Sequence, residues 1–329
     1  MKIALALVLV VGLFMLGTLG ATPGLQWTFA VALPYLAVTI FLVGIVARVV
    51  GWARIPVPFR IPTTCGQQRS LDWVGHDRLE NPHTGLQAFG RMVLEVLCFR
   101  SLLRNTSSSM NAEKRLVYTT DLALWAGAMA FHWSMALVLL RHLRLFTEPT
   151  PAFIGAAEAL DGFLEVGVPV VFASSVIFLV ALTYLLLRRL TNPQVRYISL
   201  VGDYFPLLLL LTIGGTGFWM RHVAKIDVAA VKELALGLVH FSPTVPASID
   251  PLFYGHLFLV CVLLAYFPAS KLVHMAGVFL SPTRNMANNN RAVRHVNPWD
   301  HPVPVHSYAE YEDEFREKMI AAGVPVEKE

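Results

Sequence analysis

Charged residues are scarce in this sequence, and its few cysteines are scattered. Only 15% of the 329 residues are charged, whereas 55% are hydrophobic and the mean hydropathy is +0.57. This composition excludes an ordinary soluble globular domain and indicates an integral membrane protein. The net charge of +4 does not indicate nucleic-acid binding, because the basic residues gather in loops beside hydrophobic segments, as the positive-inside rule explains.

The cysteines Cys65, Cys98 and Cys261 lie far apart in the chain. They form no C-x-x-C pair, no C-x-x-C-H motif and no zinc-ligand spacing. These motifs therefore give the chain no iron–sulfur cluster or c-type haem of its own.

Long hydrophobic segments predict an all-α bundle of about six transmembrane helices. The expected spans cover residues 3–19, 27–50, 122–140, 163–187, 204–220 and 252–280. The first is followed by Thr22-Pro23-Gly24 and could instead be a cleaved signal peptide, although we favour a retained helix. Residues 226–241 are expected to form a surface helix on the outer side.

The pattern divides the chain into four parts. Residues 1–50 hold two N-terminal spans, 51–116 a basic cytoplasmic loop, 117–280 a four-helix membrane core and 281–329 a cytoplasmic tail. Both termini are then cytoplasmic, in a multi-pass protein of the cytoplasmic (inner) membrane. Within the loop, residues 85–104 read as an amphipathic helix that lies on the membrane or docks a cytoplasmic partner.

Two of the expected spans carry two histidines each. His132 and His142 are ten residues apart, and His256 and His274 are eighteen apart. At 1.5 Å per residue these separations are about 15 Å and 27 Å, and Pro268 is a kink site that helps to absorb the difference. Eighteen residues is five helical turns, so the second pair is expected on one helix face.

The third and sixth spans run antiparallel, so residues at one depth face each other. His132 then pairs with His274 at the inner depth, and His142 pairs with His256 at the outer depth. Imidazoles in hydrocarbon need partners, and two pairs at two depths predict two flat cofactors, for which haem fits best. His222 and His240 are rivals for the outer site. The remaining histidines are expected to be solvated or to contact a partner: His76, His83, His295, His301 and His306.

Four segments carry a family resemblance: PVPFRIPTTCGQQRSLDW, EVLCFRSLLRNT, FHWSMALVLLRHLRLFTEP and SPTRNMANNNRAVRHVNPW. They resemble the DsrM family, the membrane cytochrome b subunits of DsrMKJOP complexes of dissimilatory sulfur metabolism. The histidine spacing is also similar to that of the membrane subunit of respiratory nitrate reductase, in which four histidines bind two b-type haems. This chain departs from that subunit by an extra N-terminal span and a longer cytoplasmic loop, so its quinone-site residues have no assigned counterparts.

The resemblance implies two haem b groups and an electron-transfer subunit of a quinone/quinol oxidoreductase complex. Menaquinone or menaquinol would be the substrate, and the partners would be a DsrK-like cytoplasmic iron–sulfur subunit and further membrane or periplasmic subunits. An iron held by two imidazoles has no open position, which suits electron transfer. Cys65 is either a free cytosolic thiol or a residue at the iron–sulfur contact.

Haem propionates need cationic partners, and a quinone site needs a proton acceptor. Arg141 and Arg144 flank the outer pair and Lys271 precedes His274, although ordinary interfacial basic residues are the alternative. Outer-side candidates for the proton acceptor are Glu148, Asp161 and Glu165. The competing function is a haem-free membrane anchor or proton-coupled transporter with structural or relay histidines.

Overall fold

The computed structural model describes residues 1–55, 66–162, 170–293, 302 and 304–328, and it is mostly helical. Within these described residues, six helical segments are long and apolar enough to cross a membrane: Lys2–Ala21, Thr28–Ala53, Leu122–Leu145, Ala173–Thr191, Val201–Ala224 and Pro251–Ala269. Their number agrees with the prediction of about six spans.

The long helices are α1 (Lys2–Thr18), α2 (Leu33–Ala53), α5 (Leu122–His142), α7 (Ala173–Thr191), α9 (Val201–Trp219) and α11 (Pro251–Tyr266). The shorter ones are α3 (Gly85–Cys98), α4 (Arg100–Leu103), α6 (Ala152–Asp161), α8 (Pro193–Ile198), α10 (Val228–Val239), α12 (His274–Gly277), α13 (Pro282–Asn285) and α14 (Tyr308–Ala321). Two π-helical turns, Thr28–Ala32 and Met220–Ala224, extend α2 and α9.

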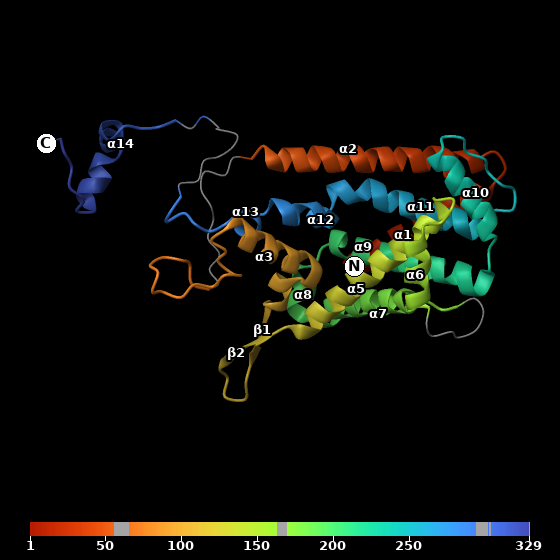
Figure 1. The fold of residues 1–329 in the computed structure, drawn as a ribbon, viewed down its shortest axis with the longest axis horizontal. Coiled ribbons are helices and arrows are strands. Elements are labelled where there is room, and N and C mark those ends of the chain that lie inside the picture. The colour runs from red at the N-terminus through yellow and green to blue at the C-terminus, as the bar shows by residue number, and fades with distance from the viewer. Residues whose placement is uncertain (56–65, 163–169, 294–301, 303, 329) are drawn as a thin grey trace.

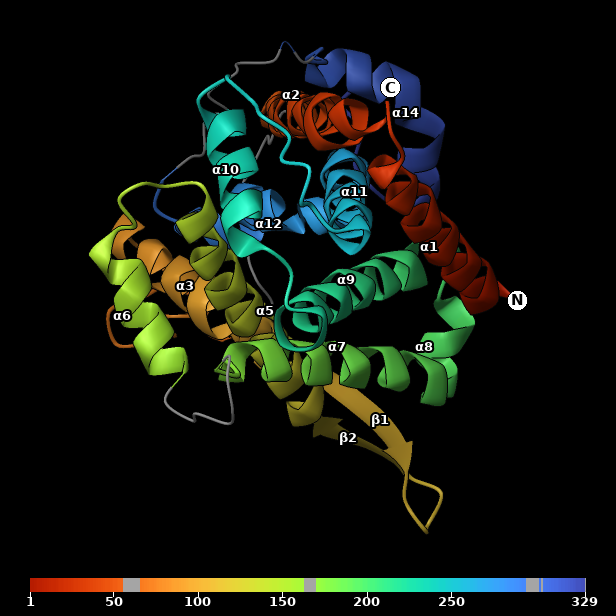
Figure 2. The ribbon, with the colours of Figure 1, turned by 90° about the vertical axis from the view of Figure 1, so that its right-hand side faces the viewer.

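Helix α11 lies at the centre of the bundle and packs against α1, α2 and α9, while α5 packs against α7 (Figures 1 and 2). The α5–α7 contact depends on Gly127, where an added Cβ would lie 2.5 Å from the Tyr184 ring. Small residues at helix contacts allow the close backbone approach on which packing in membranes relies.

The bundle has two distinct ends (Figure 1). We call the end that carries α3, α4, α8 and α13 the cap end, and the end that carries α6 and α10 the far end. The Lys2 ammonium donates a 2.7 Å hydrogen bond to the Ser199 carbonyl, just before α9, which places the N-terminus at the cap end.

Helix α5 starts at the cap end of the bundle, and the Asp121 side chain is its N-cap. Its carboxylate accepts a 3.0 Å hydrogen bond from the Leu124 amide and a 2.6 Å hydrogen bond from Arg188 at the end of α7. Partial burial raises the pKa of Asp121, but the Leu124 amide and the Arg188 guanidinium together bring that pKa below its usual value of 3.8.

The all-α prediction is wrong between α4 and α5, where a β-hairpin forms. Strands β1 (Thr106–Met110) and β2 (Leu116–Thr120) pair antiparallel, and the hairpin projects from the bundle in both views (Figures 1 and 2). The Asn111 side chain accepts the amides of Glu113 and Arg115 and so closes the turn. Ser, Thr and Val side chains favour this extended pairing over a helix.

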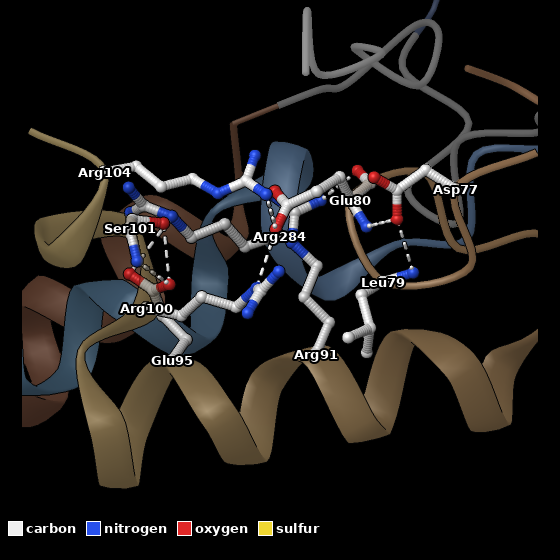
Figure 3. Close-up of polar contacts among 9 residues, drawn as sticks. All are labelled: Asp77, Leu79, Glu80, Arg91, Glu95, Arg100, Ser101, Arg104 and Arg284. Atoms are coloured by element: carbon white, nitrogen blue, oxygen red, sulfur yellow. Dashed lines mark hydrogen bonds and ion pairs between the residues drawn. The ribbon is translucent and has the colours of Figure 1, made fainter. Parts of the chain in front are cut away.

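The amphipathic helix expected over 85–104 forms, but it breaks at Phe99, which adopts the left-handed conformation with φ 49°. Ion pairs fix the broken helix to its surroundings (Figure 3). Glu80 pairs with Arg100 at 2.6 Å and Arg104 at 3.3 Å, and Glu95 pairs with Arg284 of α13 at 3.5 Å. The network ties three cap segments together.

The sixth span is not the continuous helix expected over 252–280. Helix α11 ends at Tyr266, and Ser270 is extended with φ −106° and ψ 177°. Pro268 lacks an amide hydrogen, and the Ser270 hydroxyl accepts the Leu272 amide at 3.1 Å, which starts a new turn. The prediction that His256 and His274 share a face of one helix is therefore wrong, although the break does occur at Pro268.

The fourth span begins at Ala173 rather than at residue 163. Residues 170–172 are not helical, and the Asp161 carboxylate accepts the Ser174 amide at 2.7 Å, which fixes the start of α7. The helix predicted over 226–241 is present as α10 (Val228–Val239).

Candidate functional site

The inner histidine pair lies at the cap end, between α5 and the start of α12. The centres of the His132 and His274 rings are 6.1 Å apart and their planes are perpendicular. Metal–imidazole bonds are about 2 Å long, so two rings that bind one metal from opposite sides have centres roughly 6 Å apart. The break at Ser270 is what brings His274 to this distance.

Aromatic residues of the cap enclose the His132 ring. The Phe99 ring lies edge-on to it at 4.8 Å. Two indoles hold the end of α3 in place, because Trp133 donates to the Leu97 carbonyl at 3.1 Å and Trp125 donates to the Cys98 carbonyl at 2.8 Å. The left-handed turn at Phe99 therefore serves to place its ring against the inner pair.

The outer pair, His142 at the end of α5 and His256 near the start of α11, lies toward the far end. The His256 Nδ1 is 2.9 Å from the Thr216 hydroxyl oxygen, and that hydroxyl donates to the Thr212 carbonyl at 2.8 Å. The oxygen of a hydroxyl that donates to Thr212 is free to accept the Nδ1 hydrogen of His256. Gly217 gives the ring its space, since an added Cβ would lie 3.4 Å from the His256 Cε1.

Three of the four histidines bond Nδ1 to a backbone carbonyl oxygen. The pairs are His132 with the Ala128 carbonyl at 2.8 Å, His142 with the Val138 carbonyl at 2.7 Å and His274 with the Lys271 carbonyl at 2.9 Å. A carbonyl only accepts, so Nδ1 carries the hydrogen and the Nε2 of a neutral ring keeps its lone pair. This is the arrangement that orients imidazoles for metal binding.

This donor set suits haem better than a bare metal ion. Within the described residues, no group of three or more His, Cys, Asp or Glu side chains is arranged to hold a metal ion. A porphyrin brings four ligands of its own, so haem iron needs only one or two from the protein. A pair of oriented imidazoles at each depth fits that need.

The basic residues expected to neutralise propionates already have carboxylate partners. Arg141 is buried and pairs with Asp161 at 3.1 Å, and Arg144 pairs with Glu158 at 2.9 Å. At the cap end, the exposed Lys271 pairs with Asp203 at 2.7 Å. The sequence could not show these pairs, because each partner lies on another helix.

The proton-acceptor candidates fall into different settings. Asp161 is buried between Arg141 and Ser174, whose hydroxyl donates to it at 2.6 Å. Glu148 is mostly exposed and forms an ion pair with Lys232. Glu165 lies outside the described residues. The two carboxylates that the structure describes are therefore both bound to cations.

The rival histidines lie at the same end and have other contacts. His222 packs on Phe218 with ring centres 4.4 Å apart, and His240 is exposed at the end of α10. Among those expected to be solvated or to contact a partner, His306 is exposed, whereas His76 and His83 each have a buried ring nitrogen. Burial lowers the pKa of His83, and the nearby Arg69 lowers it further. His295, His301 and Cys65 lie outside the described residues.

Comparison with known proteins shows the family of this chain. A family model described as the nitrate reductase gamma subunit matches residues 94–295, which hold all four paired histidines. The chain belongs to the nitrate reductase gamma subunit family. The expected resemblance to membrane cytochrome b subunits is thus confirmed.

Two curated relatives of this family member cover most of its length. A protein of Archaeoglobus fulgidus is 45% identical over 279 residues, which is 83% of each chain. A second, from Archaeoglobus profundus, is 42% identical over 300 residues, or 89% of this chain and 87% of the relative. Both are named Hdr-like menaquinol oxidoreductase cytochrome b-like subunit.

Sequence reasoning missed the residues of α9 that support the outer pair. Thr216 and Gly217 lie in the run Gly214-Gly215-Thr216-Gly217, inside an otherwise apolar span. Such a run of small residues signals close approach by a neighbouring helix. It could have indicated that α9 packs against one of the histidine helices.

Proposed function

We propose that this chain is the dihaem cytochrome b subunit of a membrane menaquinol oxidoreductase complex. It exchanges electrons between the menaquinone pool and a DsrK-like cytoplasmic iron–sulfur subunit in dissimilatory sulfur metabolism. The observation that carries this proposal is the pair of histidine sites at two depths, each ring held through Nδ1 with Nε2 available. The names of the two curated relatives support the quinol-linked role.

Each histidine pair would hold one haem b, with His132 and His274 at the cap end and His142 and His256 at the far end. When bound, haem supplies one-electron redox chemistry. The two imidazoles of each pair would hold the iron and leave no place for another ligand. Two pairs separated by the ten residues between His132 and His142, or about 15 Å along α5, place the cofactors at successive depths of the bilayer.

The cap end is proposed to face the cytoplasm. Its segments carry Arg69, Arg78, Arg91, Arg100 and Arg104, and the positive-inside rule places such a concentration on the cytoplasmic side. The iron–sulfur partner would then dock on α3, α4 and the hairpin, where Phe99 lies between the cap surface and His132. Quinol chemistry is proposed at the far end, where Asp161 is the candidate nearest to the outer pair through Arg141.

The alternative, a haem-free anchor or proton-coupled transporter, is less well supported. A proton relay needs histidine nitrogens linked to other titratable groups. Here three of the four Nδ1 atoms are bonded to carbonyl oxygens of their own segments, which fixes ring orientation but carries no proton between helices.

Substitution of single histidines tests the proposal. His142→Ala is expected to remove one haem per chain and leave the other, as counted by the pyridine haemochrome method on purified protein. His240→Ala is the matched control, because its ring is exposed at the same end and is hydrogen-bonded to the Leu236 carbonyl in the same way. Equal haem content in the parent and in both variants would contradict the proposed pairs.

A further inference from the structure

Three arginines gather at the far end beside the outer histidine pair, and one of them differs from the others. Arg141 and Arg144 are each ion-paired, with Asp161 and Glu158. No carboxylate of the described residues lies within 4.0 Å of the third, Arg221. Within the described residues, the positive charge of Arg221 has no carboxylate in ion-pair contact.

The Arg221 side chain is held in place without satisfying its charge. It is half-buried, its Nε, like that of Arg141, is buried without a hydrogen-bond partner, and one Nη donates a long 3.5 Å hydrogen bond to the Val170 carbonyl. Its guanidinium lies 4.5 Å from the centre of the Phe172 ring. A partly buried guanidinium is stabilised when an anion pairs with its charge and accepts its free N–H groups.

Position links Arg221 to both members of the outer pair. It follows Gly217, which lies against the His256 ring, by four residues on the same continuous helical segment. Arg221 is connected to His142 through the Phe172 ring. That ring also contacts the Arg141 guanidinium at 3.8 Å, and Arg141 precedes His142 in the sequence. Arg221 sits on the π-helical turn Met220–Ala224, a helix irregularity that is frequent at functional sites.

We propose that Arg221 is the cation that pairs with a carboxylate of the outer haem and raises the reduction potential of that haem. Haem b carries two propionate carboxylates, and a guanidinium binds a carboxylate through two parallel hydrogen bonds. Arg141 and Arg144, which the sequence indicated for this role, are already engaged by carboxylates of the protein. This role for Arg221 rests on the proposed dihaem function.

The sign of the effect follows from charge. Ferric haem carries one more positive charge than ferrous haem, so a nearby cation disfavours the ferric form. Arg221→Gln removes that cation and exposes the iron to an uncompensated propionate. Both changes favour the ferric form and lower the potential.

The test is a potentiometric titration of the haem that His142→Ala removes, followed by visible absorbance. In Arg221→Gln we expect its ferric-to-ferrous ratio at a given potential to rise at least tenfold, a downward shift of about 59 mV for one electron. Arg221→Lys, which keeps the charge, should lie close to the parent. Arg196→Gln, the same change at an exposed residue of α8 at the cap end, is the matched control and should show no shift.

Each result decides the matter. An Arg221→Gln potential equal to that of Arg196→Gln would overturn the role. If Arg221→Gln fails to hold the outer haem, retention of that haem by Arg221→Lys supports the role, and its loss from both variants overturns it. A parent protein without two haems would instead refute the proposed function, so the two failures are distinguishable.

Discussion

Replacement of Thr216 by Val probes how the bundle prepares His256 for a metal. The Thr216 hydroxyl lies 2.9 Å from the His256 Nδ1, where its oxygen can accept the Nδ1 hydrogen, and it comes from a different helix. Val keeps the branched shape but removes that hydroxyl. The ring then loses both its orientation and the electron donation that a hydrogen-bonded imidazole provides.

The expected size can be estimated in two ways. Leaving a buried donor unsatisfied costs about 1–3 kcal/mol. Loss of a hydrogen-bond partner behind a metal ligand typically weakens metal binding by about 10–100-fold, or about 1.4–2.7 kcal/mol at 1.36 kcal/mol per tenfold. The two ranges agree, so we expect the outer haem to bind about 10–100-fold more weakly and the inner haem to be unchanged.

The assay is retention of haem during dilution in detergent, read from the reduced-minus-oxidised spectrum. Thr212→Val is the control, because the Thr212 hydroxyl donates to the Leu208 carbonyl of its own helix and does not contact a histidine. We also expect the potential of the outer haem to rise in Thr216→Val, since a less basic imidazole stabilises ferric iron less. Equal haem retention in the two variants would refute the reasoning.

Three further predictions concern the pairs and the packing. His132→Ala and His274→Ala should each remove the same haem signal, and loss of different signals would contradict the inner pair. Asp121→Ala should lower stability by about 1 kcal/mol at pH 7, through loss of a helix cap. Because the folded-state pKa of Asp121 is below 3.8, its contribution is present above about pH 4 and disappears as the pH falls through the folded value, so parent and variant should converge in acidic thermal melts. Gly127→Ala should cost about 1–3 kcal/mol in the same melts, whereas Gly12→Ala, with no atom within 4 Å of the added Cβ, should be nearly neutral.

The sequence predicted what depends on local pattern. Apolar runs of membrane length gave the six spans, and the histidines at 132, 142, 256 and 274 stood out because a membrane helix rarely carries such residues without a purpose. The antiparallel order of the spans then led to the pairing of His132 with His274, and the structure places these two rings close together.

What the sequence could not give depends on contacts between distant segments. A proline can kink a helix or end it. After Pro268 the helix ends, because the Ser270 hydroxyl caps the next turn. Arg141 pairs with Asp161 because α6 returns past the end of α5. Neither the helix end nor the ion pair can be predicted from the neighbouring residues in the sequence.

The central claim is that this chain holds two b-type haems on paired histidines. The most direct measurement is a reduced-minus-oxidised visible spectrum of the purified protein, with a pyridine haemochrome determination of haem per chain. We predict two low-spin b-type haems per chain. A folded, membrane-extracted protein without haem would contradict the claim and leave the anchor or transporter function in its place.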